Sequence, residues 1–326
     1  MPNRNALATL VALACSGASA ATADNLRLSG PFTHENLSVY LLHAGGRQSP
    51  GNVLTLREAM EQKKAAVYET GNVQELAIEN LSDRPVFVQA GDIVKGGKQD
   101  RVLTTDLLLP PHSGRLPIAS FCVEQGRWTK RGTEAADQFH AATASVPTRA
   151  LKTAIREPGN QQKVWSEVAA ARVMLASTGA GSASNTSMQL ALEDKRVNDS
   201  VDLYVTALSK VVDSQPDAVG FVYTVNGKFS GADVYASPDL FRRMWPKLLH
   251  SSAAEALADR NKGNAPPPAA DAIRKTLADA ENGRAAAPQR NASSTVTKKE
   301  SEGAMLYVTT HRQAGESWLH KSYIAK

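Results

Sequence analysis

The chain has 326 residues, of which 42% are hydrophobic, and it carries a formal net charge of +5. This length suits one large domain or two smaller ones. The excess of basic residues is mild and forms no dense stripe, so the composition argues against a nucleic-acid partner.

Residues 1–20 have the pattern of a signal peptide. Arg4 gives a short positive region, residues 6–14 form an apolar run, and residues 18–20 supply the small side chains that precede a cleavage site. The apolar run is far shorter than the ~20 residues that span a bilayer. We therefore expect export, with a periplasmic or secreted mature protein and no transmembrane segment. A lipid anchor at Cys15 is the alternative, because Leu13-Ala14-Cys15 approaches a lipobox.

Cleavage after Ala20 leaves Cys122 as the remaining cysteine, which excludes an internal disulfide. The fold must then be held by its apolar core, although the compartment is oxidising.

The pattern from residue 26 to about 128 predicts mostly strands, interrupted by one short helix at 55–62. Thr55 and Glu58 have the spacing of a capping box at the start of that helix. Alternating apolar and polar residues, or short apolar runs bounded by turns, mark the strands. These predicted strands are 37–42, 73–80, 84–89, 101–109 and 116–124.

The middle of the chain is predicted to be helical, with Asn160 capping a helix to about 177 and an amphipathic helix at 197–211. Asn226-Gly227 between two apolar runs predicts a β-hairpin at about 219–235. Ser237-Pro238 then begins another helix, which Pro246 must kink or restart.

Residues 261–301 are rich in Ala, Pro and Asn, so we expect a low-complexity mobile segment with a short exposed helix at 271–280. Two apolar strands at 304–310 and 317–324 should return to the sheet as the C-terminal part, 303–326. His320 is expected on the surface of the last strand. The resulting fold class is α+β, with a mostly antiparallel β N-terminal half, helices in the middle and C-terminal strands.

The segment 91–101 is the first candidate site. Lys95, Lys98 and Arg101 flank the pair Gly96-Gly97, and glycine allows consecutive N–H groups to form an anion-binding nest. Asp92 and Asp100 could orient these cations or take a proton. A solvated hairpin loop is the alternative interpretation.

The segment 121–128 is the second candidate site. Alternation places Cys122 and Glu124 on one face of a strand. Gly126 then bends or bulges the strand, so that Arg127 and Trp128 could turn toward a ligand. Glu124 could act as a general base or pair structurally with an arginine. Cys122 could be a nucleophile, but a free cysteine is most often a small buried hydrophobe, and no nearby His or Lys in the sequence marks it as activated.

The sequence has none of the usual metal-binding spacings, so we expect no metal and no cofactor.

The motif Ala90-Gly91-Asp92 with 95–101, the Pro110-Pro111 loop and 121–128 resembles the signature of the ARG-and-Rhodanese-Phosphatase-superfamily-associated protein domain family. The resemblance covers about 26–259. Through the family's gene-neighbourhood association with enzymes of ADP-ribose and phosphate groups, it implies a phosphorylated or nucleotide-like ligand.

Three functions remain open. The first is an exported protein that binds an anionic small molecule. The second is an enzyme acting on an anionic substrate, with Asp100 or Glu124 as general base, and the third is an envelope interaction protein. Binding and catalysis both require the two candidate segments to converge. The sequence leaves the oligomeric state open.

If the two candidate segments form one site, the residues expected to contact the ligand are Lys95, Gly96, Gly97, Lys98, Gln99, Asp100, Arg101, Glu124, Gln125, Arg127 and Trp128.

Overall fold

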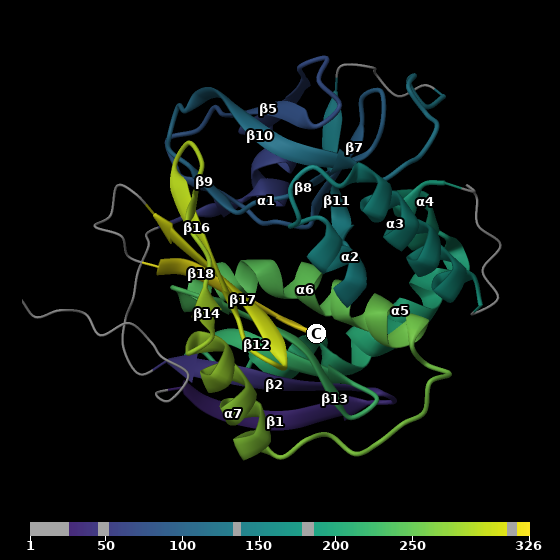
Figure 1. Cartoon of the computed structure of the whole chain (residues 1–326), viewed down its shortest axis with the longest axis vertical. Coiled ribbons are helices and arrows are strands. Elements are labelled where there is room, and N and C mark those ends of the chain that lie inside the picture. The colour runs from purple at the N-terminus through teal and green to yellow at the C-terminus, as the bar shows by residue number, and fades with distance from the viewer. Residues whose placement is uncertain (1–25, 45–51, 133–137, 178–185, 312–317) are drawn as a thin grey trace, which may run out of the picture.

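The computed structural model describes residues 26–44, 52–132, 138–177, 186–311 and 318–326. Its largest unit is an antiparallel sheet with the order β1-β2-β12-β13-β18-β17-β16-β14, in which β15 also pairs with β16 (Figure 1). The C-terminal strands therefore return to the sheet, as predicted. The strands are β1 (Leu26–His34), β2 (Leu37–Ala44), β12 (Ala218–Val225), β13 (Lys228–Tyr235), β14 (Arg284–Ala285), β15 (Gln289–Arg290), β16 (Ser294–Glu300), β17 (Ala304–His311) and β18 (Trp318–Ala325).

The rest of the N-terminal half forms a second sheet, β11-β7-β8-β10-β5-β4, and a small sheet, β3-β6-β9. The predicted strand at 101–109 is divided between them, because the chain turns at the buried Asp106. The strands are β3 (Leu54–Thr55), β4 (Ala65–Glu69), β5 (Glu75–Asn80), β6 (Val86–Val88), β7 (Asp92–Gly96), β8 (Arg101–Leu103), β9 (Leu107–Leu109), β10 (Gly114–Cys122) and β11 (Phe139–Ser145).

Local sequence signals place several of these elements. Thr55 and Glu58 form both hydrogen bonds of the capping box at the start of α1 (Leu56–Glu61). Asn226 and Gly227 have φ of 52° and 71°, the positive values that the tight turn between β12 and β13 requires.

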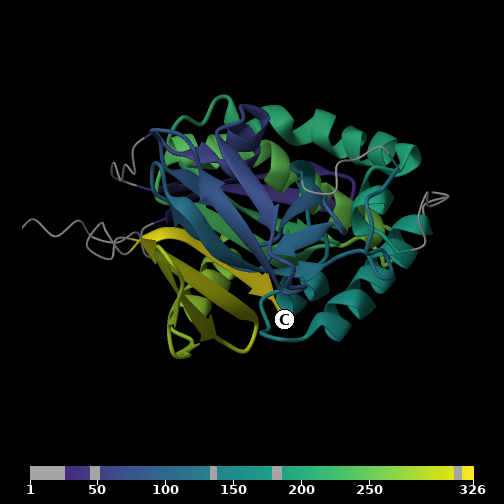
Figure 2. The same ribbon diagram turned by 90° about the horizontal axis from the view of Figure 1, so that it is seen from above.

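Helix α6 (Pro238–Ala258) lies between the two larger sheets and contacts both (Figure 1). It is one continuous helix, so Pro246 does not restart it. The teal helices lie along one side of the molecule and the yellow C-terminal strands along the other (Figure 2). The remaining central helices are α2 (Arg149–Ala154), α3 (Gln161–Ala176), α4 (Met188–Leu192) and α5 (Lys195–Leu208), followed by the 3₁₀-helix η2 (Ser209–Val212).

The segment 261–301, for which composition predicts mobility, is instead largely folded. Helix α7 (Ala270–Glu281) packs Ile273, Leu277 and Ala280 into an apolar cluster with the large sheet. These residues recur at helical spacing, and the average composition hides the stripe they form. The predicted helix at 271–280 is therefore present but buried along one face.

His320 was expected at a strand surface, and this expectation is wrong. It is fully buried in β18, which is buried along its whole length because it lies inside the large sheet.

The expected signal peptide, 1–20, and Cys15 within it lie outside the described residues. Among the helices that the structure describes, none has the length and apolar character required to cross a bilayer.

Candidate functional site

The first candidate segment forms a tight hairpin between β7 and β8. Gly96 and Gly97 have φ of +121° and +53°, which side-chain-bearing residues rarely adopt. A Cβ on Gly96 would also overlap the backbone carbonyl oxygen of Gln138. The two glycines are therefore required by the backbone itself.

Three consecutive N–H groups of this turn, those of Gly96, Gly97 and Lys98, are bonded inside the protein. Gly96 N donates to Asp100 Oδ1 at 3.0 Å, and Lys98 N donates to Glu69 Oε1 at 3.1 Å. Gly97 N donates to the Gln138 carbonyl at 3.0 Å. The expected nest thus holds two of the protein's own carboxylates, so an external anion would have to meet side chains instead.

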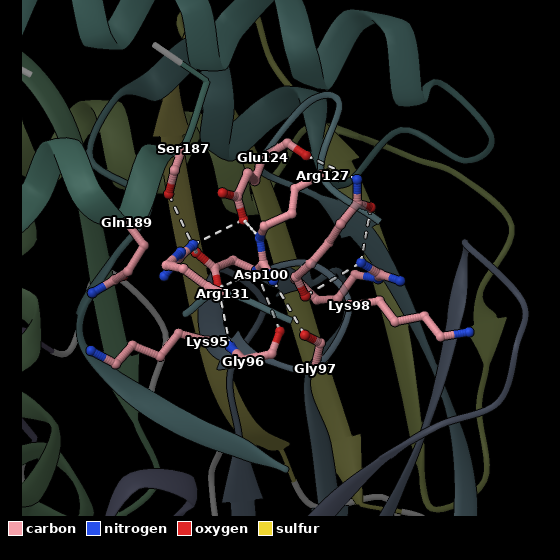
Figure 3. A network of polar contacts seen from close by, with 12 residues as sticks. Lys95, Gly96, Gly97, Lys98, Asp100, Glu124, Arg127, Arg131, Ser187 and Gln189 are labelled. Carbon is pink, nitrogen blue, oxygen red and sulfur yellow. Dashed lines mark hydrogen bonds and ion pairs between the residues drawn. The ribbon is translucent and has the colours of Figure 1, made fainter. Parts of the chain in front are cut away.

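The two candidate segments converge on a buried ion-pair network (Figure 3). Arg127 lies 3.3 Å from Asp100 Oδ1 and 2.5 Å from Glu124 Oε2. A second arginine, Arg131, bridges the same carboxylates, at 2.6 Å from Asp100 Oδ2 and 2.9 Å from Glu124 Oε2. Ser187 Oγ donates to Asp100 Oδ2 at 3.3 Å. The convergence required for a common site is therefore present.

Arg127 mainly connects the glycine turn to the segment 124–131 through hydrogen bonds. Its Nε donates to Glu124, its NH1 to the carbonyls of Gly97 and Thr129, and its NH2 to Gly96 O and Asp100. These contacts use the five donors of a guanidinium. Arg127 thus fixes the glycine turn against the 124–131 segment rather than offering donors to a ligand.

The basic residues of the first segment point in different directions. Lys95 Nζ pairs with Glu193 at 2.7 Å, whereas Lys98 Nζ lies 5.2 Å from the centre of the Trp128 ring. Lys95 and Lys98 extend to opposite sides of the network (Figure 3). They therefore do not share one cavity.

Arg101 is fully buried, 3.6 Å from Glu69 and 5.4 Å from the centre of the Trp128 ring. Its guanidinium contacts the buried side of the Trp128 ring, and its NH1 donates a hydrogen bond to Gln99 Oε1 at 3.1 Å. The Gln99 amide also donates to the Glu124 carbonyl at 3.0 Å, whereas Gln125 is exposed. Gln99 and Arg101 are thus part of the scaffold of the network.

Residues 25–324 match the family model of the ARG and Rhodanese-Phosphatase-superfamily-associated Protein domain. The chain belongs to this family. The match extends beyond the expected range of 26–259, and it includes the segment 261–301 and the C-terminal strands. No curated protein and no solved structure matches the chain.

Cys122 is buried in this family member, and its backbone N–H and carbonyl are both bonded to the Gln161 amide. Burial raises the pKa of the Cys122 thiol above its ordinary value, although Arg101 nearby opposes the shift. A thiol with a raised pKa is a poor nucleophile at neutral pH. Cys122 therefore contributes packing.

Three members of the network were missed by the sequence reasoning. Arg131 continues the basic run that begins at Arg127, so extending the second segment by three residues would have included it. Ser187 and Glu69 come from distant parts of the chain and have no sequence signal. In the part of this family member that the structure describes, no cluster of His, Cys, Asp and Glu side chains is arranged to hold a metal ion.

Proposed function

We propose that this exported protein binds a small anionic ligand, phosphate- or nucleotide-like, at a rim formed by Lys98 and Trp128, next to the ion-pair network that contains Arg131. The observation that carries the proposal is the exposure of Trp128. Its side chain is 41% exposed, although it lies beside Lys98 and above the buried Arg101. An exposed aromatic ring beside cations is suited to a ligand that has both a flat apolar part and negative charge.

The excess of cations over carboxylates in the network favours an anionic ligand. Four cations, Lys98, Arg101, Arg127 and Arg131, accompany three carboxylates, Glu69, Asp100 and Glu124. Among these described residues, one formal positive charge remains. In the part of the chain that the structure describes, no carboxylate lies within ion-pair distance of Lys98.

The two carboxylates hold the arginines in place. Arg131 has a side-chain exposure of 21%, while Asp100 beneath it is fully buried. Guanidinium groups fixed by buried carboxylates form a rigid support for the rim, so little side-chain entropy is lost when a ligand binds above them. A nucleobase or another aromatic ring of the ligand would stack on Trp128. Such a contact contributes about 1–3 kcal/mol in nucleic-acid complexes.

A thermal-shift experiment tests the proposal with inorganic phosphate, AMP, ADP-ribose and uncharged adenosine. We expect phosphate-bearing probes to raise the melting temperature of the mature protein. The effect should shrink in Trp128→Ala and Lys98→Gln and persist in Lys275→Gln, an exposed control on α7. A ligand concentration of about 1 mM corresponds to a binding free energy of about −4 kcal/mol. If none of the phosphate-bearing probes changes the melting temperature at that concentration, the proposal is contradicted.

Export is a separate part of the proposal and rests on the pattern of residues 1–20. Expression of the full chain in a bacterium, followed by fractionation and mass measurement, tests it. A processed chain outside the cytoplasm supports export, and an unprocessed cytoplasmic chain would contradict it. A lipid mass on Cys15 would identify the anchored form.

An enzyme is the second candidate, favoured by one feature of Glu124. Its Oε2 is bound by two arginines, whereas no hydrogen bond of its Oε1 occurs among the described residues. That oxygen could accept a proton from water or a substrate hydroxyl. Phosphate release from the same probes, lost in Glu124→Gln with binding retained, would support catalysis, and its absence would favour simple binding.

A further inference from the structure

A cleft of about 300 Å³ lies where the second sheet meets the large sheet. One wall comes from the β8–β9 connection and β10, through Thr104, Thr105 and Ser120. The other comes from Arg156, which follows α2, and from Arg290 on β15. Ligand sites occur preferentially at such junctions, and this volume is at the lower end of their usual range.

Neither arginine of the cleft has an ion-pair partner among the described residues. Against the effect of burial, the pKa of Asp106 is lowered by His320 and also by the charge of Arg156, but that carboxylate is paired with His320 at 2.7 Å. Across the described ranges, neither Arg156 nor Arg290 makes a side-chain hydrogen bond or an ion pair. Arg156 is half-buried, and its guanidinium carbon lies 4.3 Å from the centre of the Tyr307 ring. Stacking holds the plane of the guanidinium and leaves its edge N–H groups for an acceptor.

The acidic residue in the cleft does not compensate for these cations. Glu157 is paired with Lys163 at 2.8 Å, so its charge is balanced outside the arginine pair. The cleft therefore keeps the positive charge of Arg156 and Arg290.

Its lining also has a buried hydroxyl and apolar contacts. Ser120 is 1% exposed, and its Oγ has no hydrogen-bond partner within the described part of the chain. A buried polar atom without a partner is costly, and a bound ligand or water would satisfy it. Phe121, Ile155 and Pro158 supply apolar surface beside it.

We propose that this cleft is a second binding site, which takes a small organic anion. Its carboxylate or phosphate group is gripped by Arg156 and Arg290, and its apolar body lies against Phe121 and Ile155. The site shares no residue with the rim at Trp128. It lies on the junction that Asn291 bridges through the Asp106 carbonyl at 3.0 Å, so an occupant joins the two sheets.

Calorimetric titration of the mature protein with phenyl phosphate, benzoate and neutral benzyl alcohol tests this site. We expect at least one of the two anions to bind and the alcohol not to bind. Arg156→Gln and Arg290→Gln should each weaken binding by about tenfold, because each removes charge-assisted hydrogen bonds. Arg274→Gln, an exposed change on α7, serves as the matched control, and circular dichroism verifies that each variant is folded.

Trp128→Ala separates this site from the proposed rim. Anion binding that is retained in Trp128→Ala and weakened in Arg156→Gln supports the cleft, whatever the outcome at the rim. Binding that is unaffected by both arginine changes, equal binding of benzyl alcohol, or no binding of either anion would overturn it. Preference for phenyl phosphate or for benzoate identifies the charged group.

Discussion

His320 Nδ1 lies 2.7 Å from Asp106 Oδ2, and this buried pair joins β18 of the large sheet to the turn between β8 and β9. The other ring nitrogen of His320 lies 3.0 Å from Asp233 Oδ1. Asp106 also accepts hydrogen bonds from Ala90 N at 2.8 Å and Thr309 Oγ1 at 2.7 Å. The pair therefore connects the motif at 90–101 to the C-terminal strands.

These contacts predict a specific pH dependence. Burial disfavours the charged imidazole, but the two carboxylates outweigh it and raise the pKa of His320 to about 9, while the histidine holds the pKa of Asp106 well below its usual range. A raised pKa contributes stability that is complete below the unfolded pKa of about 6.5 and is lost as pH rises through the folded value. The melting temperature should therefore decrease as the pH rises from about 6.5 to about 9.

His320→Gln is expected to lower the melting temperature at neutral pH and to flatten its fall toward pH 9. Melting curves of both proteins across that interval check the prediction. A variant with the wild-type slope would show that His320 is not charged in the folded protein.

Leu277→Ala tests whether the segment 261–301 is part of the folded core. Leu277 is 1% exposed on α7, and truncation of a buried leucine costs about 2–5 kcal/mol. Leu203→Ala on α5, where the side chain is 60% exposed, should change stability by about 0.5 kcal/mol or less. Denaturant unfolding measures both, and equal effects would argue that α7 is not packed.

Asp100→Asn tests the network beneath the proposed rim. Asp100 is fully buried and accepts hydrogen bonds from Gly96 N, Arg127, Arg131 and Ser187. Removing one partner of a buried ion pair costs about 3–5 kcal/mol. Glu193→Gln removes a partly exposed pair, which contributes about 0–1 kcal/mol. Similar unfolding free energies for the two variants would contradict the buried network.

Much of the fold could be predicted where its signals are local. The capping box at Thr55, the Asn226-Gly227 turn and Ser237-Pro238 depend on a few neighbouring residues, and the structure has all three. The division of 101–109 between two sheets could not be predicted, because a buried charge at Asp106 is stable only with its distant partner His320.

The candidate site was predictable in the same partial way. Glycines and charges at 96–101 and 124–127 indicated a meeting of two segments, which the structure contains. The pairing of those charges was not visible, since Glu69, Ser187 and Glu193 reach the network from other elements. The number of basic residues in the sequence therefore overstated how many basic side chains are available to a ligand.

The indole N–H signal of Trp128 gives the most direct test of ligand binding at the rim. Two-dimensional NMR of ¹⁵N-labelled protein, with the signal assigned by its absence in Trp128→Phe, would follow a titration with AMP and with adenosine. The account predicts that AMP shifts the Trp128 signal with saturation, while the signals of the buried Trp245 and Trp318 stay in place. A Trp128 signal that does not move, or that moves equally with uncharged adenosine, would contradict the account.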